Sequence, residues 1–360
     1  MVTSGEVKKI SNGFVSYFKS RGYILHGSEP IIPVHDKTIA FPNATIVPLK
    51  KFFTESYNSP GFVVYQPCIR LWNIANNNFD SSFTSFFRMV SILIHPSIEL
   101  NKVQSEISEY LEHILNISAD SIIVHSSRLT DDLIGHWRKK YKVVQDEFES
   151  KFYEWNYGFN GIKGRGITLF IKFTNGSREL GNFVEIVKNK KIIGYEFGFG
   201  IESCLGIMNG YSSNFDILFG KNINKKLFDI TSVRGVIEQA LVFHKGKING
   251  TTLSSIRKVD NELVYSICEF CNGDPSYIRS INWDLLDVKL EIVESLISLL
   301  DKKINQVRMD MKLFIDYKIY LNRMIKLGRG QDWATKKIED YIQKNNYYKI
   351  VGLFNKNIVL

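Results

Sequence analysis

The sequence has few cysteines, no long apolar run and no glycine-rich phosphate loop, and each absence excludes a class of protein. Four cysteines among 360 residues fit a reducing compartment, and none of their pairings demands a disulfide. No uninterrupted apolar run reaches the roughly 18 residues of a membrane span, and residues 1–13 are too polar for a secretory signal. We therefore expect a cytoplasmic protein with no membrane partner. The glycine spacings of Rossmann and P-loop nucleotide folds are also missing.

Two other features, a cysteine pair and the net charge, exclude fewer functions. Cys268 and Cys271 have the C-x-x-C spacing of a zinc site, but a structural zinc needs two further ligands, and no His or Cys follows nearby. We predict no structural metal. The chain has 46 Lys and Arg residues against 37 Asp and Glu, a formal net charge of +9. Such a charge attracts nucleotides and nucleic acid, but it does not choose between ATP, a tRNA and an acidic carrier protein.

Apolar periodicity divides the chain into a mixed first part, residues 1–222, and a helical second part, residues 223–360. In the first part, antiparallel strands on short connections with helices outside predict an α+β domain. The second part has helix-period apolar positions and predicts an all-helical domain. Helices are expected at residues 10–21, 104–115, 233–243, 253–268 and 283–327, and strands at residues 38–41, 62–65, 86–95, 121–125, 166–173, 182–187 and 191–197, with a turn at Asn189-Lys190.

Three ordered blocks hold the residues that could carry chemistry. Residues 18–53 include F-K-S-R-G-Y-I-L-H-G-S-E-P-I-I-P and D-K-T-I-A-F-P-N-A-T-I-V-P-L-K-K-F-F. Residues 65–70 read Y-Q-P-C-I-R, and residues 83–89 read F-T-S-F-F-R-M. Residues 195–210 read Y-E-F-G-F-G-I-E-S-C-L-G-I-M-N-G, in which a carboxylate and two spaced glycines precede an apolar helix. A strand that turns into a buried helix beside a ligand needs this pattern.

In order and spacing, these blocks resemble the catalytic domain of the alanyl-tRNA synthetase family. The resemblance implies a class II fold, an antiparallel sheet flanked by helices, and a reaction in which ATP and Mg²⁺ activate a small amino acid as an aminoacyl adenylate. The helices of the second part, with V-F-H-K-G at residues 242–246, resemble the domain that holds the tRNA acceptor stem. We expect the family's editing and oligomerisation domains to be absent.

The resemblance also implies roles for single residues. Arg70 would grip the α-phosphate and the substrate carboxylate, and Phe86 or Phe87 would stack on adenine. Glu196 would bind the substrate ammonium, and Trp155 would wall the amino-acid pocket. The remaining implied positions are Gly198 and Gly200, which keep the pocket open, Glu185 at the ATP site, and Arg88, expected to add cationic charge for catalysis.

Departures from the family pattern make the function less certain than the fold. Ser203 stands where the family has an arginine against the ATP phosphates, and Arg88 and Lys188 are two gained cations that we expect to replace it. The loop at residues 71–82 is shorter than usual, and residues 247–252 lack the family's asparagine and arginines for the acceptor stem.

Three functions therefore stay open. The first is activation of a small amino acid with transfer to a carrier-protein thiol or a small amine. The second, from another class, is a synthetase-derived binding or regulatory protein without catalysis. The third is charging of tRNA with alanine.

Overall fold

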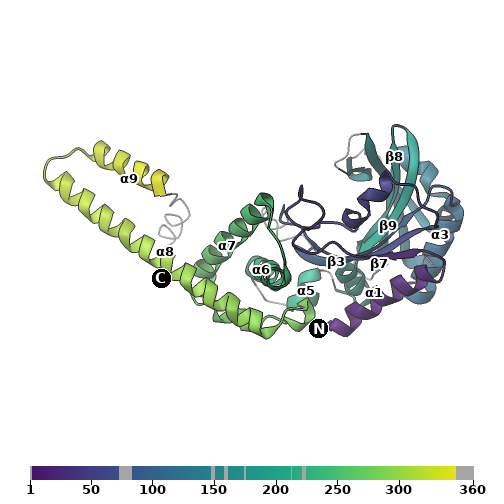
Figure 1. Ribbon diagram of the computed structural model, residues 1–360, viewed down its shortest axis with the longest axis horizontal. Helices are drawn as coiled ribbons and strands as arrows, with labels where there is room; N and C mark the ends of the chain where they lie inside the picture. The colour runs from purple at the N-terminus through teal and green to yellow at the C-terminus, as the bar shows by residue number, and fades with distance from the viewer. Residues whose placement is uncertain are drawn as a thin grey trace. The chain divides into compact units, whose positions relative to one another are not determined.

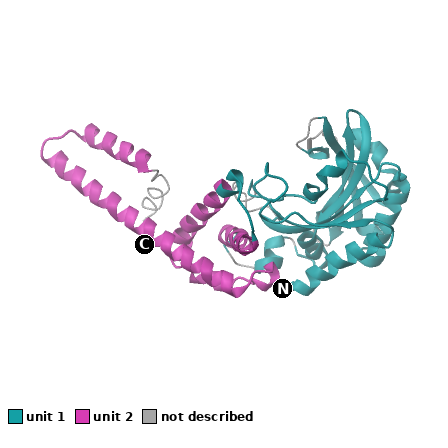
Figure 2. Ribbon diagram, in the orientation of Figure 1, with its two compact units in different colours: residues 1–225, 244–253 teal, residues 226–243, 254–360 magenta. Residues whose placement is uncertain are grey.

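A computed structural model describes residues 2–72, 83–146, 151–157, 161–173, 176–211, 213–220 and 224–345 (Figure 1). The chain divides into two compact units (Figure 2). Unit 1 comprises residues 1–225 and 244–253, and unit 2 comprises residues 226–243 and 254–360. Unit 1 is built on a mixed sheet flanked by helices, and unit 2 is helical, which confirms the predicted fold class. Within the described residues, no helix combines the length and the apolar character needed to cross a bilayer.

The sheet of unit 1 places strands from the whole first part of the chain side by side. Its order in the described residues is β1-β2-β3-β9-β8-β7-β4-β5, and β6 pairs with β7. β1 is parallel to β2 and β4 to β5, while the other pairs are antiparallel. The strands are β1 (Ile24–His26), β2 (Gly61–Ile69), β3 (Phe86–Ile94), β4 (Ile122–Ser126), β5 (Lys142–Gln145), β6 (Glu154–Asn156), β7 (Ile162–Phe173), β8 (Gly176–Lys188) and β9 (Lys191–Gly200).

The hairpin between β8 and β9 turns at the predicted pair. Asn189 and Lys190 have φ values of 51° and 68°, which are the left-handed conformations of a two-residue turn that matches the twist of the strands. The turn and the register shift between Ile186 and Val187 together set the register in which Glu185 lies opposite Tyr195 and Val184 opposite Glu196. This register decides which side chains of β8 and β9 share a face.

The two faces of the sheet have different neighbours, because successive side chains of a strand point to opposite sides. One face packs against α1 (Ser4–Lys19), α3 (Leu100–Glu109) and α4 (Ile201–Met208), with Phe14 at 5.5 Å from Phe199 and Trp137 at 5.4 Å from Phe183. The opposite face packs against η1 (Val47–Phe53) through an apolar cluster. Its buried members are Ile46, Leu49, Phe53, Phe62, Val64, Leu93, Ile162 and Ile186.

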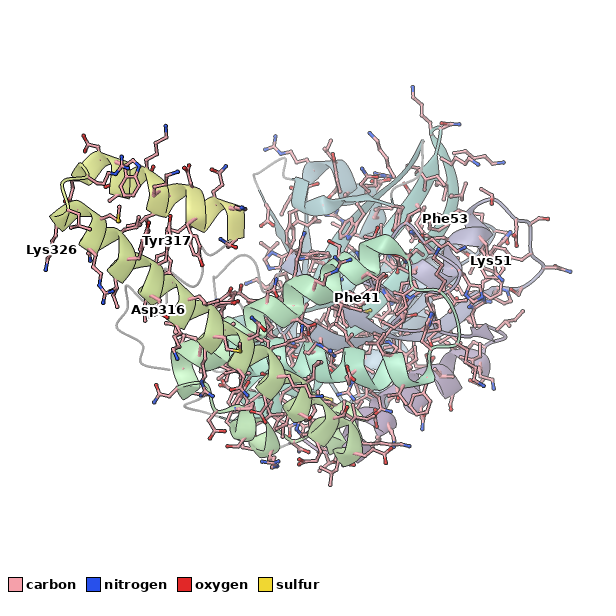
Figure 3. The ribbon with its side chains drawn as sticks, turned by 60° about the vertical axis from the view of Figure 1, so that its left-hand side comes forward. Phe41, Lys51, Phe53, Asp316, Tyr317 and Lys326 are labelled. Carbon is pink, nitrogen blue, oxygen red and sulfur yellow. The ribbon has the colours of Figure 1, made fainter. Side chains whose placement is uncertain are left out.

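The helices of unit 2 have their own packing. They are α6 (Lys225–Phe243), α7 (Gly250–Cys271), α8 (Leu290–Lys326) and α9 (Gln331–Asn345), and α6 and α7 have their first residues in unit 1. Gly235 lies under the ring of Trp283, where a Cβ would come within 2.2 Å of Cζ3. Tyr317, labelled in Figure 3, stacks on Tyr341 at 4.3 Å and joins α8 to α9.

Two of the differences between the predicted and the observed elements have a local cause in the structure. Residues 38–41, predicted as a strand, form no strand, because side chains rather than a neighbouring strand bind this backbone. Thr252 Oγ1 donates to the carbonyl of Ala40 at 2.8 Å, and Asn249 Nδ2 donates to that of Ile39 at 3.5 Å. The helix predicted from residue 283 begins at Leu290, because Asp287 adopts a left-handed conformation with φ 56°.

Candidate functional site

The central cavity lies on the face of the sheet that is covered by η1, and an inner cavity, which α4 also lines through Glu202 and Ser203, adjoins it. The central cavity has a volume of about 580 Å³, and the inner cavity has about 90 Å³. The two cavities share Arg70, Met89, Asn182 and Gly198. Strands β3, β8 and β9 therefore contribute one residue each to the boundary between them, and the residue after β2 contributes the fourth.

Arg70 follows the last residue of β2 and is held in place by its backbone and by its side chain. Its N–H donates to the carbonyl of Ser85 at 2.8 Å, and its Nε donates to that of Asn43 at 2.9 Å. The guanidinium carbon lies 4.7 Å from the centre of the Phe87 ring. Burial lowers the pKa of Arg70, and among the described residues no carboxylate forms an ion pair with it. An anionic ligand would supply the missing counter-charge.

Glu196 points into the central cavity from β9. Tyr157 Oη and Thr45 Oγ1 each donate a hydrogen bond to the carboxylate at 3.2 Å. Burial nevertheless raises the pKa of Glu196 to about 7, although the two hydrogen bonds favour the ionised form. Burial also raises the pKa of Tyr157, as does the neighbouring carboxylate. A ligand cation that entered the cavity would favour the ionised carboxylate and would be held by it.

The walls of the central cavity are mainly apolar. Trp155 of β6 lines it together with Val184 of β8, and Trp155 lies opposite Gly164 of β7. Gly198 leaves the cavity open and also lets β9 approach β3, because a Cβ there would lie 2.7 Å from the Cβ of Ser91. The predicted residues Arg70, Trp155, Glu196 and Gly198 thus meet in one cavity.

The inner cavity is polar and has little positive charge. Asn182 Nδ2 donates to Glu179 at 3.0 Å, and Asn214 Nδ2 donates to Ser203 at 3.4 Å. Of the described residues that line this cavity, Arg70 is the single cationic one. The predicted residues Phe87 and Gly200 also line it.

Four predicted residues lie away from both cavities, and the strand pleat explains three of them. Phe86 and Arg88 flank Phe87 in β3 and point to the other face, where the Arg88 guanidinium lies 5.8 Å from the Phe86 ring. Glu185 follows Val184 in β8 and forms an ion pair with Arg165 at 2.7 Å, on the face opposite the cavities. The fourth is Lys188, which lies at the end of β8 beside the hairpin turn.

Arg88 forms an internal ion pair that the sequence does not predict. Its side chain is buried, and Nε donates to Oε1 of Glu202 at 2.8 Å. The backbone N–H of Arg88 donates to Oε2 of the same carboxylate, also at 2.8 Å. This geometry corrects the expectation that Arg88 and Lys188 replace the charge missing at Ser203.

Sequence reasoning missed further residues of the site. Glu202 follows the second glycine in the first turn of α4, but nothing in the sequence signals its partner in β3. Thr45 and Tyr157, which bind Glu196, are likewise visible only after folding. Most of the shortened loop, residues 73–82, lies outside the described residues.

Comparison with known proteins identifies similar sequences and folds. A family model described as tRNA synthetases class II (A) matches residues 9–192. The alanine–tRNA ligase of Legionella pneumophila is 24% identical over 242 residues, which cover 58% of this chain and 28% of the relative. That of Clostridioides difficile is 23% identical over 261 residues, which cover 63% of this chain and 29% of the relative. The chain thus spans less than a third of the length of these curated relatives.

Solved structures give more distant similarities. Pyrrolysyl-tRNA synthetase from Desulfitobacterium hafniense has a TM-score of 0.36 and 11% identity over 60% of this chain and 74% of the other. Histidyl-tRNA synthetase from S. aureus has a TM-score of 0.37 and 11% identity over 57% of this chain and 66% of the other.

Proposed function

The chain belongs to the family of class II (A) tRNA synthetases, and we propose that unit 1 activates a small amino acid with ATP as an aminoacyl adenylate. The observation that carries the proposal is that Arg70 and Glu196 line the same cavity. In this reaction, the substrate carboxylate attacks the α-phosphorus of ATP, and pyrophosphate leaves. A guanidinium beside the carboxylate and the α-phosphate, with a carboxylate at the ammonium, would orient the reactants and stabilise the developing charge.

The cavity residues support a small substrate and a magnesium nucleotide. Trp155 and Val184 limit the space beside Glu196. Magnesium needs one or two protein carboxylates in addition to phosphate oxygens and water. Glu179 fits this requirement in the inner cavity, whereas Glu202 is already bound to Arg88. Magnesium would neutralise phosphate charge that Arg70 alone leaves unbalanced.

The acceptor of the activated amino acid is proposed to be a carrier-protein thiol or a small amine, with tRNA as the family alternative. Residues 247–252 are short, and two of their polar side chains are used inside unit 1. Asn249 and Thr252 bind the backbone carbonyls of residues 39 and 40. This internal use supports an acceptor other than the acceptor stem that the family's longer segment reads.

Amino-acid-dependent exchange of pyrophosphate into ATP tests the proposal. All twenty amino acids are screened with the wild type, Arg70→Ala and Glu196→Gln, with the exposed-residue variants Arg138→Ala and Glu294→Gln as matched controls. We expect exchange with a small amino acid, a loss of at least about 100-fold in the first two variants, and no loss in the controls. Exchange that survives Arg70→Ala and Glu196→Gln would refute the assignment.

A second candidate function is binding without catalysis. The observation that favours it is the inner cavity, where Ser203 supplies no charge, while Arg88 lies outside the cavity and is paired with Glu202. This alternative predicts that isothermal titration calorimetry detects binding of an amino acid or ATP to the wild type. The same protein would show no pyrophosphate exchange with any amino acid.

A further inference from the structure

A third cavity adjoins the central cavity but not the inner cavity. This outer cavity has a volume of about 640 Å³ and shares Thr38, Val47 and Lys50 with the central cavity. It has no lining residue in common with the inner cavity. The central cavity therefore borders on the inner cavity on one side and on the outer cavity on another, and a second reactant could approach it from the outer cavity.

The outer cavity contains a histidine held by a buried carboxylate. His35 Nδ1 lies 2.9 Å from Glu29 Oε2, and the Glu29 side chain is only 4% exposed. A carboxylate accepts a hydrogen bond, so Nδ1 carries the proton in the neutral ring and Nε2 keeps its lone pair. The imidazole is 81% exposed, which leaves Nε2 accessible to a reactant in the cavity.

The sheet fixes the position of this pair. Glu29 Oε1 accepts the backbone N–H groups of Val34 at 2.7 Å and His35 at 2.9 Å. The buried side chain of Gln66 in β2 binds the backbone of Glu29 twice: Oε1 accepts the Glu29 N–H at 2.8 Å, and Nε2 donates to the Glu29 carbonyl at 2.9 Å. This arrangement is the orienting carboxylate and accessible imidazole that general-base catalysis requires.

Resting on the proposed function, we propose that the outer cavity admits the acceptor and that His35 is the base that deprotonates it. The acceptor sulfur attacks the carbonyl carbon of the aminoacyl adenylate, the bond from that carbon to the phosphate oxygen breaks, and AMP leaves with the bonding electrons. The thiol proton passes to Nε2 of His35 and then to water. Glu29 is a positioning residue that holds the imidazole.

The lining of the cavity indicates a thiol on an anionic arm. Lys51 and His26 line it on the outside, and Lys50 lies at its boundary with the central cavity in an ion pair with Asp36 at 2.8 Å. Lys51, labelled in Figure 3, has its ammonium 4.9 Å from the Phe52 ring. A thiol has an ordinary pKa of about 8.5 and reacts as the thiolate, so one imidazole suffices to activate it. A phosphopantetheine group combines such a thiol with a phosphate that the ammonium of Lys51 could bind.

The experiment separates transfer from activation. The full chain receives preformed alanyl adenylate and either 4′-phosphopantetheine or its phosphate-free analogue pantetheine, and thioester formation is followed by mass spectrometry. We expect His35→Ala to slow thioester formation by roughly 100-fold or more, with exogenous imidazole restoring part of the rate, and Glu29→Gln to slow it less. Lys51→Gln should raise KM for the phosphorylated probe alone. His113→Ala, at an exposed histidine of η2 (Tyr110–Ile114), is the matched control.

The outcomes distinguish this inference from the proposed function. Pyrophosphate exchange by His35→Ala should stay within about twofold of the wild type, since the base acts after adenylate formation. Equal losses of exchange and transfer, or no rescue by imidazole, would show that His35 only supports the loop. Aminoacylation of total tRNA without thioester formation would overturn the thiol assignment. A wild type without exchange that still transfers from preformed adenylate would refute activation and leave the His35 assignment supported.

Discussion

Replacing Glu196 with glutamine should stabilise the protein while it removes the ammonium site. Burial raises the pKa of this carboxyl from 4.5 to about 7. Such a group binds a proton more readily in the folded than in the unfolded chain. Protonation of Glu196 therefore favours the folded state at acid pH, and this contribution to the free energy of unfolding is lost as the pH rises from about 4.5 to about 7. Ionised Glu196 then costs the fold about 3 kcal/mol, since one pKa unit corresponds to about 1.4 kcal/mol.

The assay is urea denaturation of the wild type and Glu196→Gln at pH 5 and pH 8. A neutral glutamine avoids the cost of ionisation, and Tyr157 and Thr45 keep an oxygen to which they can donate. We expect the variant to be more stable by up to about 3 kcal/mol at pH 8 and by less than about 1 kcal/mol at pH 5. Glu185→Gln is the matched control on the other face, where loss of the ion pair with Arg165 should destabilise the fold.

The same titration should control substrate affinity. Only the ionised carboxylate holds an ammonium group, so amino-acid affinity should fall about tenfold for each pH unit below 7 and level off above it. Glu196→Gln should bind weakly with a flat profile over this range. A variant that is less stable than the wild type at pH 8, or an amino-acid affinity that does not change between pH 6 and pH 8, would refute the reasoning.

Further outcomes follow from the ion pair, the glycines and the nucleotide site. Arg88→Met should destabilise the protein by about 3–5 kcal/mol, because it leaves the Glu202 carboxylate buried without its partner, and the double variant with Glu202→Leu should recover most of that loss in urea denaturation. Gly198→Ala should lower the free energy of unfolding by about 1–3 kcal/mol and weaken ligand binding, because the new Cβ would lie 2.7 Å from the Cβ of Ser91 in β3. Gly200→Ala should have the melting temperature of the wild type, because the closest contact of its Cβ is at 3.5 Å. Removal of Mg²⁺ with EDTA should abolish ATP binding in calorimetry, and Glu179→Gln should raise the Mg²⁺ concentration required.

The sequence could predict the pocket because its key residues sit in short, distinctive segments. Arg70 ends a strand of the Q-P-C-I-R block, and Glu196 precedes two glycines whose spacing requires close backbone approach. These local patterns survive without knowledge of tertiary contacts. The strand order that joins them, with β3 between β2 and β9, is not signalled by the periodicity of the sequence and is known only from the structure.

The wrong face predicted for residues of β3 has a physical cause. A fully buried strand is apolar on both sides, so its sequence does not say which alternate residues face a cavity. Phe86 and Phe87 are both buried, at 4% and 8% exposure, and only tertiary packing separates them. Once Phe87 is placed in the inner cavity, the pleat excludes Arg88 from it.

The partner of Arg88 then changes how the nucleotide site must work. Glu202 comes from a helix more than a hundred residues later in the chain, and its carboxylate binds both the backbone and the side chain of Arg88. A buried charge of this kind needs a partner, so the guanidinium cannot also serve a phosphate without leaving Glu202 unpaired. Among the described residues that line the inner cavity, Arg70 is consequently the one cation that could bind the phosphates of ATP. In the proposed reaction, the phosphates would therefore be bound by Arg70 and by the magnesium that accompanies the nucleotide, rather than by a second arginine.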